Sequence, residues 1–91
     1  MGYDIIARRV CDDTVVSDIS FGYASPLQKP FFDLMGYVKG SGISKTYTVT
    51  ELKAIKKAST TAIENDFYRR EVKRFLSNCI SANEVIDVWF I

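Results

Sequence analysis

The chain has 91 residues, of which 47% are hydrophobic and 25% charged, and its net charge is +1. This length predicts one globular domain over residues 1–91, and the apolar content argues against disorder. A net charge this small gives no whole-molecule field that favours nucleic acid or a membrane, so any such preference must come from local clustering.

The chain contains no histidine, which removes the commonest general base, the commonest metal ligand and the usual Ser/His and Cys/His nucleophile systems. Its two cysteines, Cys11 and Cys79, lie far apart and cannot form a zinc site alone. We expect both to be reduced and buried, as in a cytosolic protein. The N-terminus, MGYDIIARRVCDD, has no signal-peptide pattern, and no apolar run is long enough to span a bilayer. These features predict a cytoplasmic, non-enzymatic protein with no metal, cofactor or membrane contact.

The N-terminal third predicts an antiparallel hairpin. Tyr3–Val10 is rich in β-forming residues, and Val15–Ala24 alternates apolar and polar positions as a strand with one wet face does. Between them, Cys11–Thr14 contains two aspartates whose side chains can bond to nearby backbone amides, which is typical of a tight turn.

The next segment predicts a short helix and a loop. We expect the helix to begin at Pro30, because an earlier start would place this proline inside the helix, where it removes a hydrogen bond. Four apolar side chains would lie on it: Phe31, Phe32, Leu34 and Met35. Gly36 would end it, and Lys39–Ser44 (KGSGIS) predicts a loop.

A second helix is expected after Tyr47, where a short extended piece ends. Thr48 and Glu51 form a capping box, and Tyr47 with Leu52 supplies a hydrophobic staple. The inner stripe would contain Leu52, Ile55 and either Ala58 or Ser59. Ser59–Thr61 are poor residues for a helix interior and indicate either a break or a bend. We expect the break, with Thr61 and Glu64 as a second capping box.

The C-terminal third predicts a helix over Ala62–Cys79 and a final strand over Glu84–Ile91. This strand is apolar on both faces apart from Asp87, so we expect both faces to be covered for most of its length. The predicted fold is α+β. It has a small antiparallel sheet of three or four strands, formed by the N-terminal hairpin and the C-terminal strand, with two or three helices packed on one face. The first and last strands would be central.

The stretch Asn65–Phe75, NDFYRREVKRF, combines basic and aromatic residues, and helical periodicity separates them. One face would be the core face: Tyr68, Val72, Phe75, Leu76, Cys79 and Ile80. The charged side is expected to be solvated, with local pairs from Asp66 to Arg69 or Arg70 and from Glu71 to Arg74. Ile63 and Phe67 fall on this charged side. We expect a rotation at the helix break to bury both, because large apolar side chains in small domains usually find cover. The alternative is an aromatic exposed among arginines, which would be a binding surface.

The candidate partner-binding residues lie on the outer sides of the last two helices: Lys53, Lys56, Lys57, Phe67, Arg69, Arg70, Lys73 and Arg74. Such a basic face could contact an acidic protein surface or, as the alternative, nucleic acid backbone. A small enzyme such as a nuclease is a third class, for which the sequence offers no convergent geometry. We expect a protein partner, and a homodimer stays open. Trp89 is expected in the core, and Tyr47 is expected to be partly exposed as an interface anchor.

The predicted function is that of a small binding protein that acts by occupying a macromolecular surface. Short chains without a catalytic constellation often act as inhibitors, adaptors or phage-type accessory proteins. An inhibitor of a host-defence complex (anti-CRISPR-like) is one such hypothesis.

Overall fold

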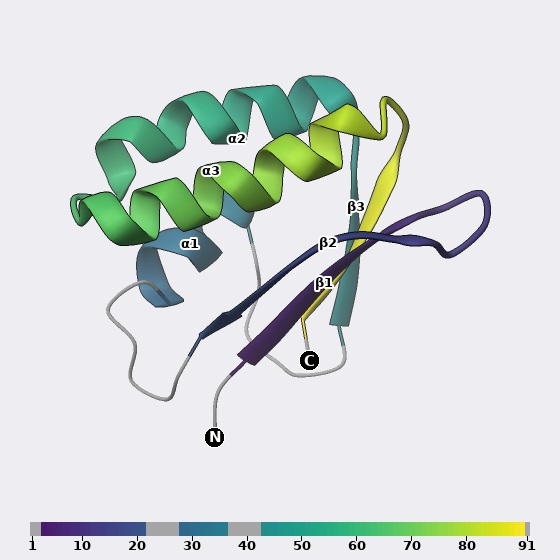
Figure 1. The fold of residues 1–91 in the computed structure, drawn as a ribbon, viewed down its shortest axis with the longest axis horizontal. Helices are drawn as coiled ribbons and strands as arrows, with labels where there is room; N and C mark the ends of the chain where they lie inside the picture. The colour runs from purple at the N-terminus through teal and green to yellow at the C-terminus, as the bar shows by residue number, and fades with distance from the viewer. Residues whose placement is uncertain (1–2, 22–27, 37–42, 91) are drawn as a thin grey trace.

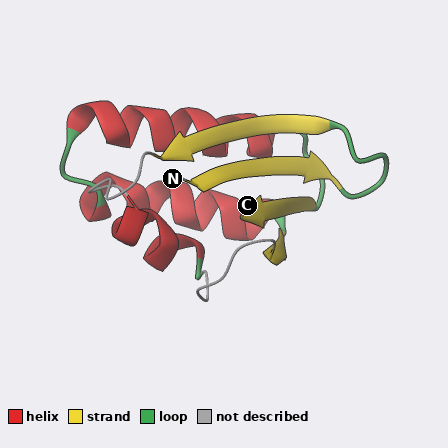
Figure 2. Ribbon diagram, turned by 90° about the horizontal axis from the view of Figure 1, so that it is seen from below, coloured by secondary structure: helices red, strands yellow, loops and turns green. Residues whose placement is uncertain are grey.

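A computed structural model describes residues 3–21, 28–36 and 43–90 of the chain. They form an α+β fold in which three helices lie on one side of a four-stranded antiparallel sheet (Figures 1 and 2). The strands are β1 (Tyr3–Arg9), β2 (Val15–Phe21), β3 (Ile43–Tyr47) and β4 (Ile86–Phe90). Their order across the sheet is β2-β1-β4-β3. The first and last strands are therefore central, which confirms the predicted fold class and the place of these two strands.

The β1–β2 hairpin forms where the sequence predicts it. Asp12 accepts a hydrogen bond from the backbone N–H of Thr14 at 3.0 Å, and Asp13 has a φ of 57°, a left-handed conformation that aspartate tolerates. The register shifts between Ala7 and Arg8, which marks a β-bulge near the end of the pair. Asp12 thus serves the turn through its carboxylate, and Asp13 through its backbone conformation.

Helix α1 (Gln28–Met35) begins two residues before the predicted start. Pro30 is its third residue, and a missing N–H costs nothing there because the first-turn amides have no intrahelical acceptor. Gly36 ends the helix with a φ of +67°, and a Cβ at this position would lie 2.9 Å from Lys45 Nζ. Most of the predicted loop Lys39–Ser44 lies outside the described residues. Its last two residues belong instead to β3, where Ile43 and Ser44 pair with the end of β4.

Helix α2 (Val49–Ala62) has the predicted capping box. The Thr48 hydroxyl accepts from the Glu51 amide at 3.2 Å, and the Glu51 carboxylate accepts from the Thr48 amide at 3.0 Å. The break expected at Ser59–Thr61 is absent there, because Ser59 is buried with its hydroxyl donating to the Lys56 carbonyl at 2.6 Å.

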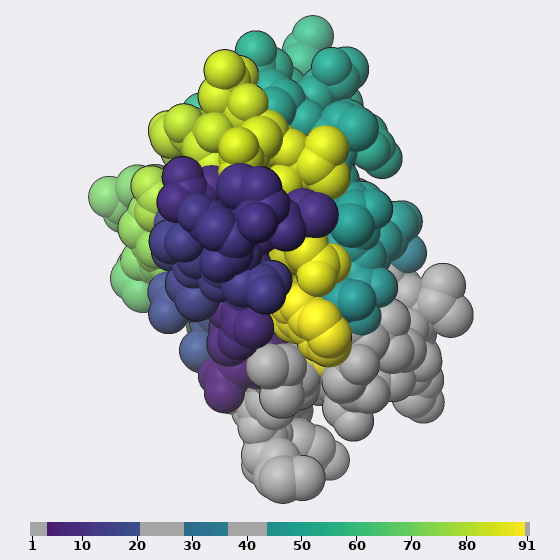
Figure 3. All heavy atoms as spheres, turned by 90° about the vertical axis from the view of Figure 1, so that its right-hand side faces the viewer, coloured from purple at the N-terminus to yellow at the C-terminus, as the bar shows by residue number. Residues whose placement is uncertain are grey.

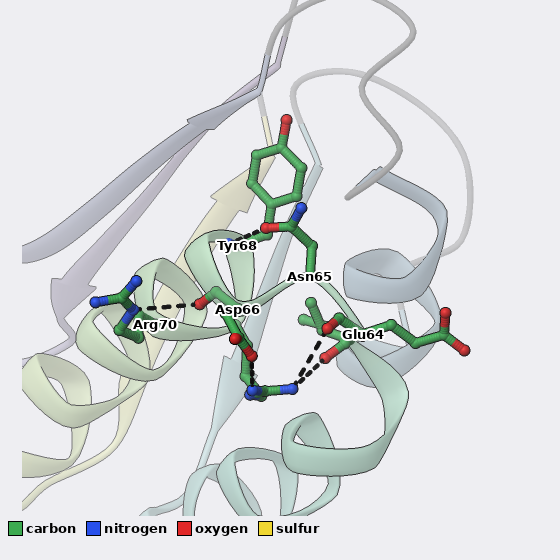
Figure 4. Close-up of polar contacts among 7 residues, drawn as sticks. Glu64, Asn65, Asp66, Tyr68 and Arg70 are labelled. Carbon is green, nitrogen blue, oxygen red and sulfur yellow. Dashed lines mark hydrogen bonds and ion pairs between the residues drawn. The ribbon is translucent and has the colours of Figure 1, made fainter.

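The helix break lies at residues 63–65, and α3 (Asp66–Ser81) follows. Asn65, rather than Thr61, is its N-cap, and its side-chain oxygen accepts from the Tyr68 amide at 3.1 Å (Figure 4). The Thr61 hydroxyl donates to the Ala58 carbonyl within α2. The two helices are therefore confirmed, while the position of the break and the second capping box were wrong.

The core lies between the helices and the facing side of the sheet. Its largest fully buried side chains include Tyr47, Phe31, Phe75 and Phe90. Phe31 meets Phe75 edge to face with ring centroids 5.9 Å apart, and Phe32 meets Phe90 at 6.0 Å. Burial of Tyr47 contradicts the partial exposure we expected. Its hydroxyl donates to the Met35 carbonyl at 2.6 Å, so the phenol can be buried without losing its hydrogen bond.

The other side of the sheet is covered by no described helix or strand, and Figure 2 shows the strands in front of the helices. Along β4, Ile86, Val88 and Phe90 are buried, whereas Asp87 and Trp89 between them are only half-buried. Two expectations were therefore wrong: no described helix or strand covers the second face of β4, and Trp89 lies outside the core. Local hydrophobicity does not specify how many layers a sheet will carry, since that depends on where the helices pack.

Candidate interface on the outer helical surface

Charge is divided between the two layers of the fold. The helical segment 49–81 carries seven basic and four acidic side chains. The strand segments 3–21, 43–47 and 84–90 carry three basic and six acidic ones. The net charge of +1 therefore conceals a positive helical layer above a negative sheet layer. A positive surface of this kind attracts anionic groups.

Helices α2 and α3 lie side by side (Figure 1), and a hollow of about 320 Å³ lies on their surface. We call it the lysine groove, after its lining residues Lys53, Lys56, Lys57, Thr60, Lys73 and Ile80. The spacing of the three α2 lysines places them on one side of that helix. Lys73 comes from α3, so the helix pairing brings together cations that are remote in sequence.

The four lysines of the lysine groove are free to take a ligand. Among the described residues, no ammonium group of this set makes an ion pair or a hydrogen bond. Four like charges around one hollow repel each other, and an anion placed between them relieves that repulsion. This arrangement can bind phosphate or carboxylate groups, with lysine acting as a compact point charge rather than a planar clamp.

Arg69 belongs to the fold rather than to this groove. Its guanidinium donates to the carbonyls of Ile63 and Glu64, at 3.3 and 3.5 Å, and it pairs with the Asp66 carboxylate. These bonds hold the linker between α2 and α3 against the start of α3. Among the candidate residues, Arg69 is the one whose bonds hold this linker.

Arg70 and Arg74 differ in how far they are engaged. Arg74 pairs with Glu71 at 3.0 Å and donates to the Asp18 carbonyl of β2 at 3.2 Å, so it also ties α3 to the sheet. Arg70 makes one long bond to the Asp66 carbonyl, at 3.4 Å, and no ion pair with a described residue. The predicted local pairs Asp66–Arg69 and Glu71–Arg74 are confirmed.

Phe67 is 60% exposed, although we expected it to be covered. Ile63, the other residue in that prediction, is 3% exposed and joins the core. The two differ because the break at residues 63–65 separates them: Ile63 is in the linker and turns inward, while Phe67 is in the first turn of α3. Its ring contacts Tyr68 edge to face, with centroids 5.6 Å apart. A large aromatic side chain is thus left on the surface.

Phe67, Arg70 and Arg74 follow the spacing i, i+3 and i+7 and form one stripe of α3, which we call the Phe67 stripe. Lys73 lies on the other side of Arg70, in the lysine groove. The structure therefore brings the candidate residues into two adjoining sets on the outer helical surface, with Arg69 apart from both. Sequence reasoning missed Thr60 and Ile80 as lining residues. Ile80 could have been predicted as a lining residue, because it lies seven residues after Lys73 and therefore on the same side of the helix.

Other surface features are less suited to binding. A second hollow of about 310 Å³ includes Lys45, Asp33 and Glu51 in its lining, so its charges are mixed. Cys11 is exposed, which corrects the expected burial, whereas Cys79 is buried. The Cys11 thiol donates to Glu84 at 3.1 Å, and this hydrogen bond is the main reason its pKa is raised. A raised pKa opposes the thiolate that a reactive cysteine requires.

The described residues contain no group of three metal-ligating side chains, and no helix among them is both long and apolar enough to cross a membrane. Comparisons with protein-family models, with curated proteins and with solved structures found no match to this chain. The functional proposal therefore depends on the chemistry of the surface alone.

Proposed function

We propose that this chain is a non-enzymatic binding protein that occupies an acidic surface of a protein partner through the outer side of α3. The exposed Phe67 beside Arg70 carries this proposal. Protein interfaces concentrate their binding energy in a few aromatic and arginine side chains near the centre of the contact. Phe67 would be the apolar anchor, and the neighbouring cations would select an acidic partner and speed its association.

Two observations support binding rather than catalysis. The chain has no histidine, and Arg69 and Arg74 are already bonded within it. A protein of this kind acts by excluding whatever else uses the surface that it covers. Inhibition of a host-defence complex, as by a phage-type accessory protein (anti-CRISPR-like), is the form of this action that we propose.

Replacing Phe67 by alanine is expected to weaken partner binding by about tenfold or more, which corresponds to roughly 1–2 kcal/mol for an aromatic anchor. The measurement is quantitative mass spectrometry of proteins retained from extracts of the native source by the wild-type chain and by Phe67→Ala. A protein enriched by the first and depleted with the second is the partner.

Val15→Ala is the matched control, because Val15 is also exposed, at 53%, but belongs to β2. It should retain the same partner as the wild type. Equal retention by Phe67→Ala would show that the interface does not include this stripe and would contradict the proposal.

Nucleic acid is the second candidate partner, and the four unpaired lysines of the lysine groove favour it. If each lysine neutralises one phosphate of a DNA duplex, a plot of the logarithm of the binding constant against the logarithm of the salt concentration should have a slope of about −3.6. Lys57→Gln and Lys73→Gln should each reduce the slope by about 0.9. Fluorescence anisotropy with a labelled duplex and a labelled single strand measures this.

Lys29→Gln is the control for these variants. Lys29 is highly exposed, pairs with Asp33 and lies on α1 rather than on the outer helical pair, so its loss should leave the slope unchanged. No association at low salt, or equal slopes for all variants, would eliminate the nucleic-acid candidate.

A further inference from the structure

The uncovered side of the sheet carries an ordered pattern along its two central strands. Because side chains alternate between faces, Ile6 and Arg8 of β1 point away from the helices, as do Asp87 and Trp89 of β4. All four are half-buried. The pattern continues beyond the strand ends, where Val10 and Val85 are 52% and 44% exposed.

The strand register joins these residues into cross-strand pairs. Ile6 lies opposite Trp89, and Arg8 lies opposite Asp87. The Val10 amide donates to the Val85 carbonyl at 3.5 Å, which aligns a third pair with the first two. Figure 3 shows this end of the molecule, with the β1–β2 hairpin in purple beside the yellow C-terminal segment. The uncovered face therefore has one charged pair between two apolar pairs.

The central charged pair is incomplete. No ion pair joins Arg8 and Asp87 among the described residues, and the Nε atom of Arg8 is buried without a hydrogen-bond partner. A buried donor without an acceptor costs free energy, more so when the group is charged. The Arg8 guanidinium also makes no ion pair with a described residue, and a carboxylate approaching from outside the chain would neutralise its charge.

We propose that a second copy of this chain covers the face, in a two-fold dimer packed sheet against sheet. A two-fold axis parallel to the strands and midway between β1 and β4 exchanges the two strands. Arg8 then meets Asp87 of the second copy, Ile6 meets its Trp89, and Val10 meets its Val85. Every central contact joins complementary groups, as an isologous interface requires. Face-to-face sheets cross at about 30°, so this match is best in these central rows.

The outer strands are compatible with the same axis, which exchanges β2 with β3. Asp18 lies in register with Ile6, and Ser44 lies in register with Trp89. Asp18 would therefore meet Ser44 of the second copy, and the axis brings no two like charges together. A nucleic acid is a poorer occupant, because on the described part of this face Asp4, Asp18 and Asp87 outnumber the cation Arg8.

A charge exchange tests this dimer. Sedimentation equilibrium of the wild-type chain should show a concentration-dependent shift from 10.3 kDa to twice that mass. Arg8→Asp and Asp87→Arg should each raise the dimer dissociation constant by about tenfold or more, because each places like charges across the interface. The double variant Arg8→Asp/Asp87→Arg should restore dimerisation, since it exchanges the two charges.

Two further variants keep the test decisive. Val85→Glu should also dissociate the dimer, and it lies outside the regular strand, so it is expected to fold even if Arg8→Asp does not. Lys57→Glu, in the helical layer, should leave the dimer intact. A wild-type mass of 10.3 kDa at every concentration would overturn the proposal. The proposal would also be overturned if Lys57→Glu dissociated the dimer, or if the double variant folded but stayed monomeric.

Discussion

Phe75→Ala is expected to lower the free energy of unfolding by about 3–5 kcal/mol. Phe75 is 0% exposed and meets Phe31 edge to face in the core, so its removal leaves a cavity and also removes this ring contact. A domain of this size has a total stability of roughly 5–15 kcal/mol, so the loss is a large fraction of it. Chemical denaturation followed by far-ultraviolet circular dichroism measures the change.

Phe67→Ala is the matched comparison, since the same residue type stands in the same helix. With Phe67 60% exposed, its loss should change the free energy of unfolding by no more than about 0.5 kcal/mol. Similar destabilisation by both substitutions would mean that Phe67 is covered in solution. That result would remove the observation on which the proposed protein-binding function depends.

The second large effect is a loss of stability at alkaline pH. Burial raises the pKa of the Cys79 thiol from 9.0 to about 12. The folded chain therefore keeps this proton at pH values where the unfolded chain has lost it. The stabilisation is complete below about pH 9 and is lost as the pH rises toward 12, by about 1.4 kcal/mol per pH unit. The free energy of unfolding should thus fall by roughly 4 kcal/mol over this range.

Tyr47 adds to the same trend above pH 10, because burial, with a smaller contribution from Glu51, raises its pKa from 10.0. Denaturation at a series of pH values, in a Cys11→Ser background that removes the exposed thiol, measures the combined slope. Cys79→Ala should flatten the slope between pH 9 and 10, where the tyrosine does not yet contribute. An unchanged slope in that variant would show that the Cys79 thiol is not buried in the folded state.

Several elements could be predicted because their causes are local. The capping box of Thr48 and Glu51 needs only side chains three residues apart, and the turn at Asp12 and Asp13 needs only its own backbone. The period of α3 separated Val72 and Phe75 from the charged side. Hydrophobic strands at both ends of the chain indicated a sheet with those strands in its centre.

The errors lie where a remote segment decides the outcome. Tyr47 can be buried because the Met35 carbonyl accepts a hydrogen bond from its hydroxyl, and Met35 belongs to another element. Ser59 stays helical because its hydroxyl is satisfied within α2 while its side is covered. Phe67 and Ile63 are both large apolar residues four positions apart, so helical periodicity does not distinguish them. One is exposed and the other buried because the chain changes direction between them, at the linker of residues 63–65.

The candidate interface shows the same division. The sequence alone determined that basic residues gather in the helical segment, that the chain lacks histidine, and that β4 is apolar apart from Asp87. Only the tertiary structure decided that Lys73 joins the three lysines of α2 around one groove, and that Arg69 is used by the linker. It also decided that Trp89 and Arg8 lie on an uncovered face. The reason is physical: periodicity assigns a side chain to one face of its own element, but the packing of other elements decides whether that face meets protein or water.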